Sequence, residues 1–175
     1  KEIRGLEAGN TSEKLLGIAF DIGTTTIVGY LMDLYTGQEL SVVSTLNPQT
    51  TFGADVISRI THVNMDPFGL EELHSSVTRA LNTLIGEAVH NVGVSRNDIY
   101  AVSVVGNTCM HHLFVGVNPH SVALAPYVPV ISDPLELDPE DVRLEVNPAA
   151  KVFVLPNIAG FVGADTIGVL LATEI

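Results

Sequence analysis

Residues 16–26 have the sequence Leu-Gly-Ile-Ala-Phe-Asp-Ile-Gly-Thr-Thr-Thr. The part up to Asp21 is almost entirely apolar, which predicts a strand buried on both faces. The Gly and Thr residues that follow predict a tight turn, and residues 26–33 are rich in the β-branched residues of a second strand. This stretch therefore predicts two sequential strands whose connection begins directly after an acidic residue.

The segments that follow predict a third strand and then a long helix. A Thr36-Gly37 turn leads into a strand at residues 39–46, so the first three strands form an antiparallel meander. Apolar residues at three- and four-residue steps predict a helix over residues 70–92. We expect Asp66-Pro67 to cap its start and Gly93 to end it.

The order of all the expected elements indicates the fold class. The remaining elements are a short helix near residues 56–63, strands at 99–105 and 152–156, and helices at 108–115 and 160–171. Residues 118–147 are rich in proline and predict an irregular excursion. Together they predict an α/β fold, an RNase H-like mixed five-stranded sheet flanked by helices.

Composition limits the function classes. The chain has 175 residues, of which 46% are hydrophobic and 16% charged, enough for one domain with a sizeable core. A net charge of -12 with only 8 Lys and Arg argues against nucleic acid and against an anionic membrane surface as partners. The single cysteine excludes a disulfide framework or a cysteine-ligated iron–sulfur cluster within this chain, and it fits a reducing cytoplasm.

The turn after Asp21 carries the chemistry expected of a phosphate-binding loop. Gly23 lets the backbone pass close to a polyphosphate, and the amides and hydroxyls of Thr24, Thr25 and Thr26 supply hydrogen-bond donors. Asp21 offers a hard oxygen ligand for Mg²⁺. An ordinary β-turn is the alternative. The loop is neither a Walker A sequence nor a dinucleotide fingerprint, because Gly-Lys-Ser/Thr is absent and a strand follows.

Residues 20–25 resemble the phosphate-1 motif of the acetate and sugar kinase, Hsp70 and actin superfamily. Residues 160–166, Gly-Phe-Val-Gly-Ala-Asp-Thr, resemble the helix that connects the two lobes in that superfamily. A set of segments together resembles more closely the ATPase domain of reductive activators of corrinoid proteins. They are Asn47-Pro48-Gln49, residues 52–60, Val105-Gly106-Asn107-Thr108, Ala125-Pro126-Tyr127 and the Gly-Ala-Asp-Thr run.

The resemblance implies that residues 1–14 are a linker and that residues 15–175 are the first lobe of an actin-like ATPase domain, a fragment of a longer protein. Such activators couple ATP hydrolysis to the reduction of cob(II)amide to cob(I)amide on a partner corrinoid protein. The expected cofactors are ATP and Mg²⁺, with a [2Fe-2S] cluster in a separate domain absent from this chain. We expect the fragment alone to be inactive, and a homodimer is left open.

Two other functions fit the same elements. One is the first lobe of a small-molecule kinase of the same superfamily. The other is a non-catalytic RNase H-like interaction module, in which Asp21 and Gly23 are only structural.

The resemblance also bears on residues outside the phosphate loop. Asp165 is expected either to position the catalytic water or magnesium, or to cap a helix, and Gly163 permits close approach to the cofactor. Asp55 is expected to cap the short helix. The adjacent His111 and His112 point in different directions on a helix, so we expect a structural or partner-contact role. Cys109 is expected to be a small buried residue.

Overall fold

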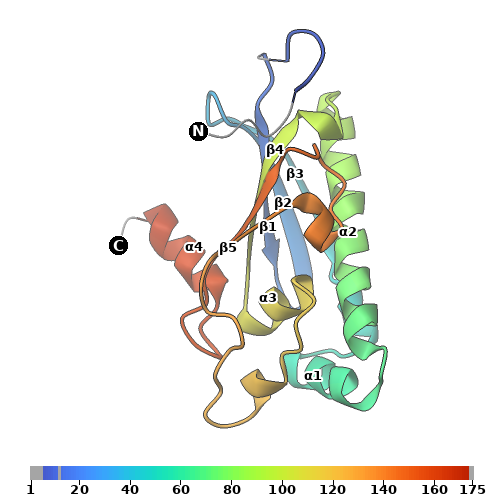
Figure 1. The fold of residues 1–175 in the computed structure, drawn as a ribbon, viewed down its shortest axis with the longest axis vertical. Coiled ribbons are helices and arrows are strands. Elements are labelled where there is room, and N and C mark those ends of the chain that lie inside the picture. Colours follow the sequence, from blue (N-terminus) through green and yellow to red (C-terminus); the bar gives the residue numbers. More distant parts are fainter. Residues whose placement is uncertain (1–5, 12, 174–175) are drawn as a thin grey trace.

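A six-stranded mixed sheet is the centre of the protein in the computed structural model, which describes residues 6–11 and 13–173 (Figure 1). The strand order is β3-β2-β1-β4-β6-β5. The strands are β1 (Leu16–Ile22), β2 (Thr26–Asp33), β3 (Glu39–Leu46), β4 (Ile99–Gly106), β5 (Leu135–Leu137) and β6 (Lys151–Val154). The first three form the predicted antiparallel meander, and β4 and β6 run parallel to β1. The predicted α/β class and the interior position of β1 are confirmed.

The prediction of five strands is wrong by one. β5 lies within the proline-rich segment that we expected to be irregular, and it pairs antiparallel with β6 at the edge of the sheet. Only Leu135 and Leu137 alternate toward the core in this three-residue strand. So short an alternation is not distinguishable from a loop by periodicity.

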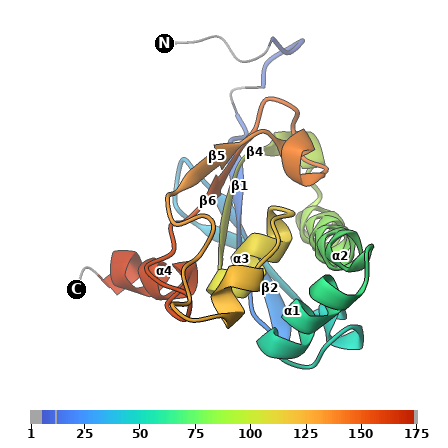
Figure 2. The same cartoon turned by 60° about the horizontal axis from the view of Figure 1, so that its bottom comes forward.

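The helices cover the two faces of the sheet unequally. Figure 2 shows α1 (Val56–Met65), α2 (Gly69–Val92) and α3 (Thr108–Phe114) on one side, and α4 (Ala164–Thr173) on the other. The main core lies on the side of α1–α3, where alternate residues of β1 point: Leu16, Ile18, Phe20 and Ile22. The face toward α4 is more open, with Tyr30, Val42 and Phe153 exposed.

The long helix α2 follows its apolar stripe. Leu73, Val77, Leu81 and Ile85 are fully buried where the helix packs on β2 and β3. As predicted, it ends at Gly93, whose φ of 75° is the left-handed conformation that glycine adopts without strain.

The predicted cap at the start of α2 is wrong. Asp66 is the last residue of the turn that ends α1, where its carboxylate accepts the Phe68 amide hydrogen at 2.8 Å. The helix begins at Gly69 without a side-chain cap. Gly69 packs so closely on α1 that a Cβ would lie 2.7 Å from the His62 carbonyl oxygen. Packing between the two helices therefore sets this boundary.

The last helix begins later than predicted. Residues 159 and 162 form an isolated antiparallel bridge, so α4 starts at Ala164. The apolar residues before it, including Phe161, do not belong to the helix. Phe161 instead stacks edge-on against Tyr127, with ring centroids 5.3 Å apart.

The predicted linker, residues 1–14, is described only in part, since residues 1–5 and 12 lie outside the described residues. Its Glu7 carboxylate accepts hydrogen bonds from the Tyr100 hydroxyl and the Asn147 amide, both at 2.6 Å. Among the helices in the described ranges, none is long and apolar enough to cross a bilayer.

Candidate nucleotide-phosphate site

The phosphate loop is the turn between β1 and β2. These strands pair up to Ile22 and Ile27, and the Gly23 amide donates to the Thr26 carbonyl at 3.0 Å to close the turn. A Cβ on Gly23 would lie 2.7 Å from that carbonyl oxygen. Glycine is therefore required here for close backbone approach, and Gly23 does not adopt a positive φ.

The carbonyl groups of the loop are bound from the inner side. Asn47 donates from its side-chain amide to the Gly23 carbonyl at 2.8 Å and from its backbone amide to the Thr25 carbonyl at 2.8 Å. The Arg59 guanidinium donates to the Thr24 carbonyl. Three consecutive carbonyls are thus satisfied by protein groups behind the loop.

The outer side of the loop presents donors. Within the described part of the chain, no residue accepts a hydrogen bond from the Thr24 or Thr25 amide. Thr25 and Thr26 are exposed, and the Thr24 hydroxyl oxygen accepts a hydrogen bond from the Asn107 side chain at 3.0 Å. A turn with inward carbonyls and free outward amides is suited to bind an anion.

Two carboxylates meet beside the loop. Asp21 lies at the end of β1 on the face toward α4, and Asp165 lies in the first turn of α4. Although the Asp21 side chain reaches solvent, its partial burial and the nearby negative charge of Asp165 raise the pKa of its carboxyl. Among the described residues, no Lys, Arg or His forms an ion pair with either carboxylate, and a bound cation would relieve the repulsion between them.

The helix-cap alternative for Asp165 does not hold, because the residue lies inside the first turn rather than before it. Its carboxylate accepts the Thr166 amide at 2.8 Å, while the Gly163 carbonyl accepts the same amide at 3.2 Å. Gly163 is buried, and a Cβ there would lie 2.6 Å from both Asn107 Cα and Thr108 N. The glycine therefore brings the start of α4 against the loop between β4 and α3.

The donor set suits a hydrated magnesium ion better than a caged metal. Across residues 6–11 and 13–173, no group of three or more His, Cys, Asp or Glu side chains is arranged to hold a metal. Mg²⁺ typically keeps several waters and binds one or two carboxylates together with substrate phosphates. Asp21 and Asp165 fit that requirement.

The contact between Arg59 and the phosphate loop was not predicted from the sequence. In the short helix predicted near residues 56–63, Ile57 is 53% exposed while Arg59 is fully buried. Arg59 stands three residues after Val56 and four before Val63, so it shares the helix face with them. An arginine at this spacing among apolar residues was the signal in the sequence for a buried charged side chain.

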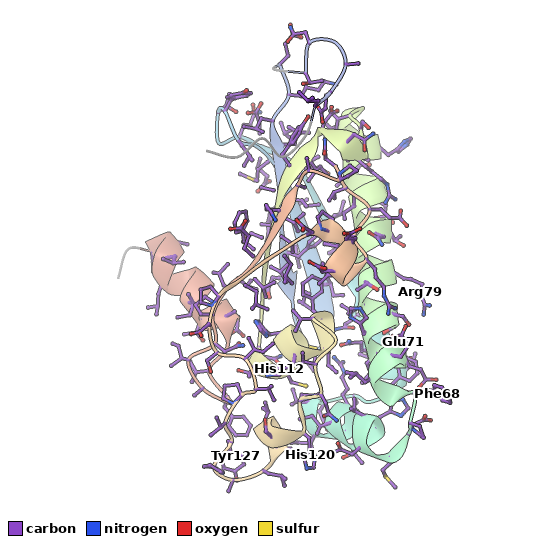
Figure 3. The ribbon with its side chains drawn as sticks, viewed as in Figure 1. Phe68, Glu71, Arg79, His112, His120 and Tyr127 are labelled. Atoms are coloured by element: carbon purple, nitrogen blue, oxygen red, sulfur yellow. The ribbon has the colours of Figure 1, made fainter. Side chains whose placement is uncertain are left out.

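The other candidates have structural roles. Asp55 and Ser58 form a capping box at the start of α1, as expected. His112, labelled in Figure 3, is buried, with Nδ1 2.7 Å from the Thr108 carbonyl oxygen and Nε2 accepting the Val130 amide at 3.0 Å. This pattern places its proton on Nδ1 and ties α3 to the following loop.

His111 and Cys109 are also buried. Neither ring nitrogen of His111 has a hydrogen-bond partner among the described residues. Its burial, and to a lesser extent the neighbouring His112, lowers the pKa of its ring to about 4. Burial raises the pKa of the Cys109 thiol to about 12, so it remains a protonated core residue.

Comparisons with known proteins agree with this fold. Residues 16–175 match the family model described as the RACo middle region. The chain is 41% identical over 163 residues to the corrinoid activation enzyme RamQ of Eubacterium limosum, covering 93% of this chain and 28% of that protein. A solved structure of a reductive activator for corrinoid, iron-sulfur protein superposes with a TM-score of 0.92 at 38% identity, covering 95% of this chain and 27% of that one.

The chain spans little more than a quarter of the length of either relative. The family match nevertheless extends over every element from β1 to α4. The predicted resemblance is confirmed, and the chain belongs to the RACo middle region family.

Proposed function

We propose that this chain is the phosphate-binding lobe of an ATPase domain in a reductive activator of corrinoid proteins. The observation that carries the proposal is the loop between β1 and β2, whose carbonyls are bound from behind and whose Thr24 and Thr25 amides are free in front. A polyphosphate is the ligand that such a row of donors beside two carboxylates suits best.

Each residue of the loop then has a role. The Thr24 and Thr25 amides donate to phosphate oxygens, and the exposed hydroxyls of Thr25 and Thr26 add further donors. Gly23 allows the backbone to approach the phosphates, and Gly163 brings α4 close enough for Asp165 to stand near Asp21. The two carboxylates hold hydrated Mg²⁺, which when bound neutralises charge on the phosphates.

The redox role is proposed from the relatives. The relatives are a corrinoid activation enzyme and a reductive activator for corrinoid, iron-sulfur protein. In our proposal the longer protein transfers one electron from a [2Fe-2S] cluster in a separate domain to cob(II)amide on a partner, giving cob(I)amide. ATP hydrolysis at the present site drives this unfavourable transfer. The single, buried and free Cys109 suits a reducing, cytoplasmic setting.

The test compares Asp21→Asn with Asp133→Asn in the complete protein. Both changes remove one exposed carboxylate, but Asp133 lies in the segment between α3 and β5 and is not part of the phosphate loop. Phosphate release and the absorbance change of corrinoid reduction are measured, with circular dichroism as the folding control. We expect Asp21→Asn to lower both rates by at least about tenfold, because an amide is a poorer ligand for a hard cation.

Asp133→Asn should retain both rates. The isolated chain is expected to be inactive, since phosphoryl transfer needs the phosphates enclosed in a preorganised, largely dry site. If folded Asp21→Asn keeps wild-type rates, Asp21 is a turn residue and the assignment is wrong. If ATP turnover is lost while corrinoid reduction is unaffected, the proposed coupling is wrong.

A further inference from the structure

Arg59 is buried and has no carboxylate in ion-pair contact among the described residues, although the negative charge of Asp55, at the start of α1, acts on it from beyond that distance. It is fully buried on α1, and its four polar contacts are all to neutral groups. Nε donates to the Gly53 carbonyl at 3.0 Å, and Nη1 contacts the Gln49 side-chain oxygen at 3.1 Å and the Met110 sulfur at 3.0 Å. Nη2 donates to the Thr24 carbonyl. Among the described residues, no carboxylate forms an ion pair with it.

A buried arginine without an ion-pair partner lowers the stability of the folded state. Removing a charge from water is unfavourable unless a partner compensates it, and an apolar side chain would pack beside Ile60 and Val63 without that cost. Burial lowers the pKa of Arg59, but a guanidinium remains protonated in proteins. Packing therefore does not explain an arginine at this position.

The explanation lies in the direction of the loop's peptide groups. In a planar trans peptide, the C=O of one residue and the N–H of the next point in opposite directions. Asn47 holds the Gly23 carbonyl inward, which turns the Thr24 amide outward. Arg59 holds the Thr24 carbonyl inward, which turns the Thr25 amide outward. The two side chains behind the loop thus set the donors in front of it.

We infer that Arg59 is a positioning residue for polyphosphate: with Asn47 it fixes the phosphate loop in its binding conformation, and the bound phosphates add negative charge near a guanidinium that has no ion-pair partner among the described residues. This inference rests on the proposed function of the loop. It also assigns a role to residues 47–60, which link the loop to the core. Gln49, which accepts from Arg59, donates in turn to the Leu73 carbonyl of α2 at 2.9 Å.

The shape of the side chain matters as well as its charge. The planar guanidinium donates in three directions at once, to Gly53, Gln49 and Thr24. A lysine ammonium at the end of a flexible chain does not match these three acceptors together. Arg59→Lys should therefore keep the charge and lose most of the positioning.

The experiment uses the complete protein with Arg59→Met, Arg59→Lys and Asn47→Ala. The matched control is Arg79→Met, which removes an arginine that is exposed on α2 (Figure 3). Dissociation constants for Mg-ATP and for adenosine are measured at a temperature where thermal unfolding shows each variant to be folded. Hydrogen exchange without nucleotide is followed at the Gly23 and Asn47 amides, which are hydrogen-bonded within the loop.

We expect Arg59→Met to weaken Mg-ATP binding at least tenfold, to leave adenosine binding within twofold, and to speed exchange at both amides. Arg59→Lys should fall between Arg59→Met and wild type, and Arg79→Met should match wild type. A folded Arg59→Met with wild-type Mg-ATP affinity and exchange, even with a lowered melting temperature, would make Arg59 a purely structural residue and overturn the inference.

Asn47→Ala keeps the test decisive if Arg59→Met does not fold. It removes one side-chain donor to the loop, so it should also weaken Mg-ATP binding and speed exchange at the Gly23 amide. Wild-type values for both would contradict the inference. If the wild-type protein itself does not bind Mg-ATP, the proposed function fails, while the exchange rates still decide whether Arg59 and Asn47 hold the loop.

Discussion

Gly163→Ala is expected to disconnect α4 from the phosphate loop. The added Cβ would lie 2.6 Å from Asn107 Cα and Thr108 N and 2.7 Å from the Gly106 carbonyl oxygen. Real Cβ atoms essentially never approach closer than 3.0 Å, and all three obstacles are backbone atoms. The start of α4 must therefore retreat by at least about 0.4 Å, carrying Asp165 with it.

Both stability and activity should respond. Overpacking of this kind typically costs about 1–3 kcal/mol, and we expect about 2 kcal/mol because the backbone cannot rotate away as a side chain can. A 1 Å misplacement of a catalytic group can cost about 100-fold in rate, so a shift of about 0.4 Å predicts a loss of roughly fivefold or more in ATP turnover.

Gly168→Ala is the matched control in the same helix. A Cβ there would make an ordinary contact of 3.4 Å with Val105 Cγ1. Replacing an interior helical glycine with alanine should stabilise α4 by up to about 1 kcal/mol. Urea unfolding gives the stability of each variant, and phosphate release by the complete protein gives turnover. Wild-type stability and turnover in Gly163→Ala would refute the importance of the close contact between Gly163 and the loop between β4 and α3. The role of Asp165, which depends on that contact, would be refuted with it.

Two further predictions concern buried or crowded charges. Because the pKa of Asp21 is raised in the folded state, the folded protein binds more protons than the unfolded chain just above pH 3.8, and the free energy of unfolding falls as pH rises through that window. Asp21→Asn should therefore raise the melting temperature at pH 7 and give no gain below pH 3.8. A lower melting temperature of the variant at pH 7 would contradict this prediction. For His111, whose pKa of about 4 lies below the ordinary 6.5, stability should be lost as pH falls from 6.5 to 4, by about 3 kcal/mol for the whole window. His111→Leu should remove most of that loss and be at least as stable at pH 7, since it eliminates two unpaired ring nitrogens; an unchanged pH dependence in urea unfolding would show that His111 is not the cause.

Local pattern was enough to predict much of the fold. The apolar run of β1, the stripe of α2 and the terminating Gly93 each depend on residues that are close in sequence. The capping role of Asp55 is also local, since Ser58 follows three residues later. Boundaries were less predictable where packing decides them, as at Gly69, which contacts the α1 backbone.

The candidate site was predictable only in part. Asp21 and the Gly-Thr turn stand out because a strand and a turn meet there, and the structure brings Asp165 near them from a distant helix. The groups behind the loop were not predicted, because Arg59 contacts Thr24 across 35 residues of sequence and Asn107 contacts it across 83. Such pairings depend on how the sheet brings separate segments together, which periodicity does not encode.

The attachment of α4 has a mechanical consequence. Ala164 is the only one of its described residues that is buried, so the closest packing of the helix is at its first turn, while Val169 and Leu171 are exposed. Ten helical residues form a stiff rod about 15 Å long. With its pivot at Gly163, α4 would transmit a movement of its far end to Asp165 at about one fifth of the amplitude, because Asp165 lies about 3 Å from the pivot and the far end about 15 Å. Swinging the exposed end by about 2 Å would thus adjust the spacing of the two carboxylates by only a few tenths of an ångström, so a distant contact on α4 would finely adjust the proposed magnesium site.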